Sequence, residues 1–147
     1  MLEFDLIIRL ILAVVFGGVV GWERQAERKP AGLRTHMLVS LGSALFTIIS
    51  FAILEKFNQS VVDPTRIAAG IVTGVGFLGA GAILQSKGEI KGLTTAASIW
   101  IVAAIGMTCG FGSFLLAGVA SIITVIILYL MDSLEDRIAS RKHENKN

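Results

Sequence analysis

Five segments of about twenty mostly apolar residues follow one another along this chain, separated by charged or turn-forming breaks. A helix of about twenty apolar residues is needed to cross the roughly 30 Å hydrocarbon core of a bilayer. The composition agrees, because 54% of the 147 residues are hydrophobic, 16% are charged and the mean hydropathy is +0.75, unlike soluble domains. We therefore expect an all-α integral membrane protein with spans at about residues 5–22, 37–54, 66–85, 93–110 and 113–131.

The distribution of Lys and Arg predicts the orientation of these spans, since cytoplasmic loops carry the excess of basic residues. Ten basic residues fall on the side of the 23–36 loop, the 86–92 loop and the tail, and three fall on the other side, namely Arg9, Lys56 and Arg66. This count predicts an N-terminus outside and a C-terminus in the cytoplasm. The uncharged turn at 110–113 leaves a four-span alternative, which would blur the charge asymmetry.

Residues 1–131 are expected to form the transmembrane domain, and residues 132–147 a short amphipathic cytoplasmic tail that extends the last helix along the membrane surface. A shift of sixty residues aligns several positions of the first two spans with the next two. The aligned pairs include Gly21 with Gly81, Gln25 with Gln85, Gly32 with Gly92 and Thr35 with Thr95. This pattern favours a parallel repeat of helices 1–2 and 3–4, although the restricted alphabet of membrane sequences also produces such matches by chance.

Glycine is concentrated in the third span, where small residues allow helix backbones to approach closely. We expect a packing face in the bundle or at a dimer seam, with a bend or an ion path lined by backbone carbonyls as the alternative. Gly17 and Gly21 form a similar face in the first span, so these two helices are expected to touch. The predicted packing positions are Gly17, Gly21, Gly70, Gly74, Gly76, Gly79 and Gly81.

Polar residues gather at the cytoplasmic ends of the first, second and fourth spans. Glu23 is either an interfacial charge or an inward-facing partner of Arg34. A hydroxyl at the start of the fourth span is available as its N-cap. The predicted cytoplasmic cluster comprises Glu23, Arg24, Gln25, Arg34, Thr35, Thr94 and Thr95.

On the outer side, Asp63 and Arg66 form the second predicted polar cluster. Asp63 followed by Pro64 is a helix-start signal, so we expect a cap. The competing role is ion binding, for which one carboxylate is few, because magnesium sites combine one or two carboxylates with waters or phosphates. Arg9 is expected to snorkel or to pair with Asp5 or Asp63.

Several functional classes lack support in the sequence. There is no phosphate-binding loop, no metalloprotease motif and no set of residues for nucleophilic catalysis, so we expect no enzyme. A formal net charge of +2, with basic and acidic residues interspersed, gives no nucleic-acid face. No cofactor is expected; a role for Mg2+ stays open, and no metal ligands are assigned.

Five ordered blocks of the chain resemble the MgtC/SapB family of bacterial inner-membrane proteins. They read GWERQ at 21–25, AGLRTHMLV at 31–39, DPTRIAA at 63–69, GFLGAG at 76–81 and GLTTAA at 92–97. The resemblance implies a five-span fold, a part in adaptation to low magnesium and, in pathogens, in virulence. It also implies that the polar residues of these blocks are functional. Many members continue into a soluble domain, so a sequence ending at Asn147 is expected to be a short form without it.

Two functions of different classes follow. The first is a membrane accessory or regulatory protein that acts through helix contacts with other membrane proteins; the resemblance suggests a magnesium transport ATPase or the membrane sector of the ATP synthase as partner. The second is a small oligomeric transporter or channel for Mg2+, protons or another cation. We expect the chain to form a homodimer.

Overall fold

The computed structural model describes residues 3–57, 63, 65–86 and 89–144. Within these ranges it describes the side chains of all residues except 57, 84–86, 89 and 132–144. Its helices are α1 (Glu3–Ala26), α2 (Leu33–Phe57), α3 (Thr65–Ala82), α4 (Leu93–Phe111) and α5 (Phe114–Glu144). Each is long and apolar enough to cross a membrane. The predicted all-helical fold with five spanning helices is therefore confirmed.

Local chemistry explains most of the helix ends. Helices α1 and α4 end in the same way, each followed by a residue in the left-handed conformation, Arg28 (φ 53°) and Gly112 (φ 94°). The backbone N–H groups that follow each helix donate hydrogen bonds to its last carbonyl groups. The expected glycine turn between the last two spans is thus observed. The N-terminus of α2 is capped by Gln25, whose Oε1 accepts from the Leu33 N–H at 3.3 Å.

The start of α4 differs from the expectation of a threonine cap. Its N-cap is Gly92 at φ 93°, with no side-chain cap, and Thr94 and Thr95 lie within the first turn. A Cβ on Gly92 would collide with the carbonyl oxygen of Ala82. The close approach of the α3 and α4 ends therefore requires glycine, and the cap prediction was wrong.

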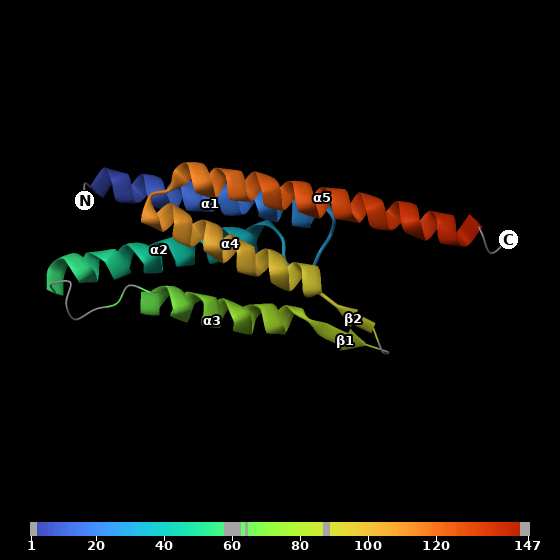
Figure 1. Ribbon diagram of the computed structural model, residues 1–147, viewed down its shortest axis with the longest axis horizontal. Helices are drawn as coiled ribbons and strands as arrows, with labels where there is room; N and C mark the ends of the chain where they lie inside the picture. Colours follow the sequence, from blue (N-terminus) through green and yellow to red (C-terminus); the bar gives the residue numbers. More distant parts are fainter. Residues whose placement is uncertain (1–2, 58–62, 64, 87–88, 145–147) are drawn as a thin grey trace.

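Between α3 and α4 the chain forms a short hairpin that was expected only as a loop. Strand β1 (Leu84–Ser86) pairs antiparallel with β2 (Glu89–Lys91). The third helix ends at Ala82, three residues before its predicted end at 85. Helix α5 continues unbroken to Glu144 and extends beyond the other helices (Figure 1).

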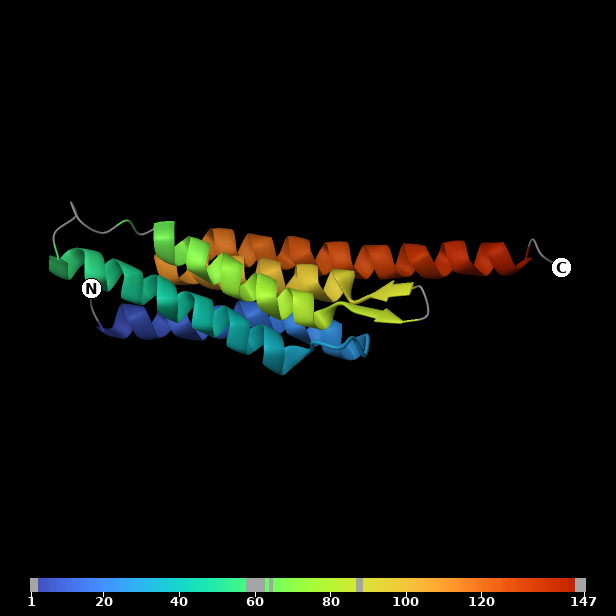
Figure 2. The same ribbon diagram turned by 90° about the horizontal axis from the view of Figure 1, so that it is seen from below.

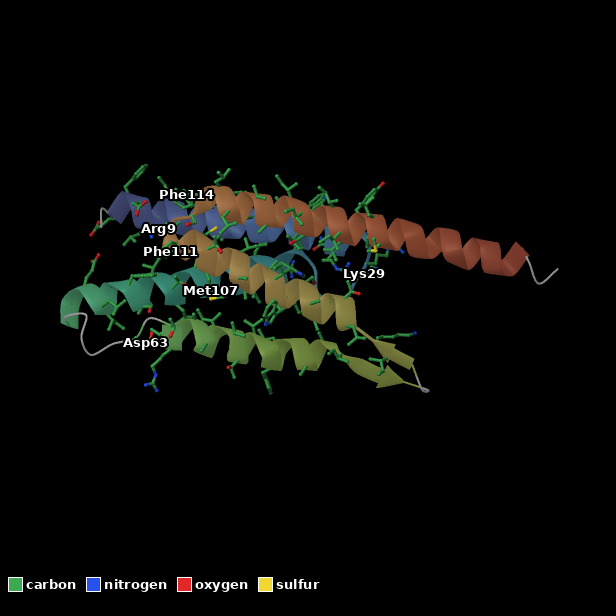
Figure 3. All side chains as sticks on the ribbon, viewed as in Figure 1. Arg9, Lys29, Asp63, Met107, Phe111 and Phe114 are labelled. Atoms are coloured by element: carbon green, nitrogen blue, oxygen red, sulfur yellow. The ribbon has the colours of Figure 1, made fainter. Side chains whose placement is uncertain are left out.

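The helices form a bundle in which α2 packs against both α1 and α4, and α5 packs against α1 and α4. Helix α3 lies at the edge of the bundle, mainly against α4 (Figures 1 and 2). The start of α1, Asp63 and the α4–α5 turn lie at one end, which we call the Asp63 end. Lys29, the α1–α2 loop and the hairpin lie at the other, the Lys29 end (Figure 3).

Glycines bring the three central helices into backbone contact. An added Cβ on Gly17 would lie 2.6 Å from the Ser40 Cβ, and one on Gly106 would lie 2.8 Å from the Ser40 C and Cα atoms. Ser40 therefore lies between α1 and α4, and its hydroxyl donates to the Ala13 carbonyl at 2.7 Å.

Gly21 likewise packs on α2, at Leu33 and His36. The prediction that Gly17 and Gly21 bring the first helix against the third was therefore wrong: their partner is α2. A small-residue face indicates that some helix approaches closely, but it does not identify that helix.

Candidate functional site

Two charged side chains at the Lys29 end of α1 turn inward. Arg24 is only 1% exposed, and its Nη1 lies 3.7 Å from Oε1 of Glu23, an ion pair longer than a hydrogen bond. Among the described residues, Nε and Nη1 of Arg24 have no hydrogen-bond acceptor. Neighbouring Trp22 is 67% exposed, on the side that meets lipid. The end of α1 thus places a buried guanidinium beside α2 and α4.

A histidine joins the starts of α2 and α4 next to this charge. His36 is fully buried, with Nδ1 2.8 Å from the Gly32 carbonyl and Nε2 3.0 Å from the Ser98 hydroxyl. A carbonyl only accepts, so in the neutral ring the proton is on Nδ1, and Nε2 is an acceptor within reach of the Ser98 hydroxyl. The Ser98 hydroxyl also lies 2.9 Å from the Thr95 carbonyl. This hydroxyl has one proton, which can be donated to Nε2 of His36 or to the Thr95 carbonyl. The direction of the Ser98 O–H bond therefore depends on whether Nε2 of His36 is protonated.

The predicted cytoplasmic residues are only partly brought together. Arg24 and Thr95 are buried, and Glu23 is largely so, with a side chain 10% exposed. Arg34 and Thr94 are exposed, Thr35 is half-buried and Gln25 is the α2 cap. The interior cluster, called the inner polar cluster below, consists of Glu23, Arg24, His36, Thr95 and Ser98.

At the opposite end, Asp63 caps α3 as predicted: its Oδ1 accepts from the Thr65 N–H at 2.9 Å and from the Thr65 hydroxyl at 2.7 Å. These bonds, with a smaller contribution from the charge of Arg66, hold the pKa of the exposed Asp63 carboxyl below its ordinary value. Arg66 is exposed one turn away.

Arg9 pairs with Asp5, the first of the two partners expected for it. Its Nη2 lies 2.7 Å from the Asp5 carboxylate, and its Nη1 donates to the Gly110 carbonyl at 2.7 Å. Arg9 therefore ties α1 to the α4–α5 turn, as Figure 3 shows beside Phe111 and Phe114.

The glycines of α3 lie in open surroundings. Gly79 packs on Ala96, whereas Gly70, Gly74, Gly76 and Gly81 have nothing within 4 Å of an added Cβ. The expected packing within the bundle therefore holds for Gly79 and not for the other four. Gly76 and Gly81 face outward, and Gly70 and Gly74 line an open groove beside α2.

The described residues contain no group of three or more His, Cys, Asp or Glu side chains that could hold a metal ion. The inner polar cluster presents a guanidinium, an imidazole and hydroxyls besides the single carboxylate of Glu23. This set can bind or orient an anionic group more readily than a divalent cation.

Several residues of the interior were missed in the sequence. His36 was noted in the sequence only as a member of the 31–39 block, and Ser98 was not considered. Gly106 and Gly110, which press on the α2 backbone at Ser40 and Ala44, form a small-x-x-x-small pattern that could have been found.

Comparisons with known proteins agree with this architecture. A model described as the MgtC family matches residues 10–137. The chain is 48% identical to "Putative magnesium transporter YhiD" of Escherichia coli K12 over 142 residues, which are 95% of this chain and 66% of YhiD. It is 43% identical to MgtC of Salmonella typhimurium LT2 over 138 residues, 94% of this chain and 57% of that protein.

The chain thus spans two thirds or less of the length of these relatives. No solved structure matches it. Five spanning helices and a family match over most of its length together show that this multi-pass membrane protein belongs to the MgtC family.

Proposed function

We propose that this chain is an accessory or regulatory protein of the bacterial inner membrane that serves adaptation to low magnesium by binding other membrane proteins through α3. The observation that carries the proposal is the contrast between the lipid-exposed sides of α3 and α5. The exposed side of α5 is bulky and aliphatic, with Leu115 84%, Leu116 62% and Ile122 59% exposed.

The exposed side of α3 instead carries a stripe of small residues, flanked by Phe77, which is 81% exposed. Ala69, Thr73, Gly76 and Ala80 are all exposed, and their spacing of four, three and four residues puts them on one face. We call this stripe the α3 small face. Packing between helices in a bilayer depends on such residues, because there is no hydrophobic driving force between helices in lipid. A partner helix would use this surface, whereas lipid alone has no need of it.

The family and the names of its relatives connect this role with magnesium. The resemblance suggests a magnesium transport ATPase or the ATP synthase membrane sector as partner, and a second copy of the chain would fit the same face. Basic residues of the loops lie mostly at the Lys29 end, which supports an orientation with this end in the cytoplasm.

The test is co-purification from magnesium-limited cells at native expression. A Gly76→Leu variant adds bulk to the α3 small face, and Val119→Leu, on the exposed side of α5, is the matched control. The wild-type chain and the control should recover the same partner, and Gly76→Leu should lose at least about tenfold of it, or about 1.4 kcal/mol. Recovery of the wild-type chain alone in mild detergents would contradict the proposal.

A second candidate is ion transport, favoured by the name of YhiD, which describes a magnesium transporter. Against it, the inner polar cluster contains the buried Arg24, whose charge repels cations, and apolar residues such as Val102 and Ile105 fill the centre of the bundle. Flux measurements on purified protein in liposomes distinguish the two functions. Magnesium, proton or potassium flux above that of empty vesicles would favour transport.

A further inference from the structure

A groove of about 670 Å3 runs between α2 and α3. Its walls are apolar, formed by Leu38, Val39 and Phe46 of α2 and by Ile67, Ile71 and Leu78 of α3. Gly42, Gly70 and Gly74 also line it, and none of them has another atom within 4 Å of an added Cβ, so the space between the two helices is left open there. None of the residues of the α3 small face lines it.

The dimensions of the groove limit what can occupy it. From Arg66 to Leu78 it follows α3 for about 18 Å at 1.5 Å per residue, close to the roughly 15 Å that one leaflet contributes to the hydrocarbon core. The length of the groove therefore matches the acyl region of one leaflet.

Charges of both signs stand where the groove reaches the membrane surface. Arg66 lines its Asp63 end, and among the residues that the structure describes its guanidinium forms neither a hydrogen bond nor an ion pair, although its charge acts on the nearby Asp63 carboxylate. Asp63, one helical turn earlier, is exposed, and both of its hydrogen bonds to Thr65 use Oδ1. A cation and an anion thus lie side by side at headgroup level.

We propose that this groove binds a phosphatidylethanolamine molecule of the leaflet at the Asp63 end. Its acyl chains lie between α2 and α3, its phosphate accepts hydrogen bonds from the Arg66 guanidinium, and its ammonium group pairs with the Asp63 carboxylate. A headgroup with a phosphate and no ammonium would leave the Asp63 charge uncompensated beside the phosphate. The two charges of the protein therefore match a zwitterionic headgroup better than an anionic one.

The experiment measures lipid retained by the purified full chain. Protein in mild detergent is exposed to an equimolar mixture of phosphatidylethanolamine and phosphatidylglycerol, washed, and analysed by native mass spectrometry. The wild-type chain should retain one phosphatidylethanolamine in preference to phosphatidylglycerol. Arg66→Gln should reduce retention of both lipids at least about tenfold, the loss expected for one hydrogen bond to a charged group.

Two further variants distinguish recognition of the lipid headgroup from binding of the acyl chains. Asp63→Asn keeps a good capping residue and should abolish the preference between the two lipids without abolishing retention. Gly74→Leu fills the groove and should prevent retention, whereas Gly76→Leu, the same substitution on the α3 small face, should retain lipid as the wild type does. Circular dichroism in the same detergent checks that both leucine variants are folded.

Three results would overturn the inference: no lipid retained by the wild type, equal retention by the Gly74→Leu and Gly76→Leu variants, or phosphatidylglycerol retained as well as phosphatidylethanolamine. If Gly74→Leu does not fold, the Arg66 and Asp63 variants still decide. The outcome is independent of the proposed function, because loss of a protein partner is measured on Gly76→Leu and loss of lipid on Gly74→Leu.

Discussion

Replacement of Gly106 by alanine should separate α2 from α4 and destabilise the bundle. The added Cβ would lie 2.8 Å from both the C and Cα atoms of Ser40 and would collide with its carbonyl oxygen. Carbon atoms pack best at about 3.5–4.0 Å, so the two backbones must move apart by about 0.7 Å or more. No side-chain rotation can relieve the contact, because all three Ser40 atoms belong to the backbone.

The cost can be measured against a matched substitution. Alanine is a better helix former than glycine by about 1 kcal/mol, and Gly76→Ala gains this without any contact within 4 Å. The difference between the two variants therefore isolates the overpacking, about 1–3 kcal/mol. It corresponds to about five- to 150-fold in the unfolding equilibrium.

Unfolding in mixed micelles, with increasing sodium dodecyl sulfate and detection by circular dichroism, gives the free energy of unfolding of each variant. Gly106→Ala should unfold at a lower dodecyl sulfate fraction than the wild type, and Gly76→Ala at an equal or higher one. Equal stability of the two variants would refute the backbone contact between α2 and α4.

Three further predictions concern hydrogen bonds. Arg9→Gln should lower the free energy of unfolding in the same assay by about 1.5–3 kcal/mol, the range for bonds to charged groups. Wild-type stability in Arg9→Lys would show that the chain does not need a guanidinium that binds Asp5 and the Gly110 carbonyl at once. The double-mutant cycle of His36→Ala and Ser98→Ala should give a coupling of about 1 kcal/mol; additive losses would contradict the bond between α2 and α4. Because the bonds from Thr65 lower the pKa of Asp63 in the folded chain, its contribution to stability should be complete above the unfolded pKa and be lost as the pH falls through the folded value. The protection factors of the amides at the start of α3, which correct for the slower intrinsic exchange in acid, should therefore fall as the pH is lowered in the wild type. A similar fall in Asp63→Ala would exclude this carboxyl as the cause.

Hydropathy alone was sufficient to predict the five helices, because crossing a bilayer requires a long apolar segment. The helix ends were less accessible. Asp63 followed by proline is a local signal and gave the correct cap, whereas the close approach at Gly92 depends on Ala82, which lies on another helix. The hairpin after α3 has no apolar pattern of its own.

The interior of the site was harder to predict than its ends. Arg24 was selected as a polar residue of a motif, but its burial depends on how α1 packs. His36 and Ser98 are 62 positions apart, and no periodicity links them. The glycines of α1 and α3 looked equivalent in the sequence, yet Gly17 and Gly21 press on α2, whereas four of the five glycines of α3 have no described atom within 4 Å of an added Cβ. The spacing of small residues predicts that they share a face, but it does not predict which helix lies against that face.

The position of Ser40 between two glycines also affects how such a protein can diverge. Enlarging a residue at this seam requires simultaneous adjustment of two neighbouring helices, so single changes there are costly. Helix α3 has open space around four of its five glycines, and substitutions on it leave the α1–α2–α4 seam untouched. Descendants of a common ancestor could therefore acquire different partners by altering one peripheral helix while keeping the same scaffold.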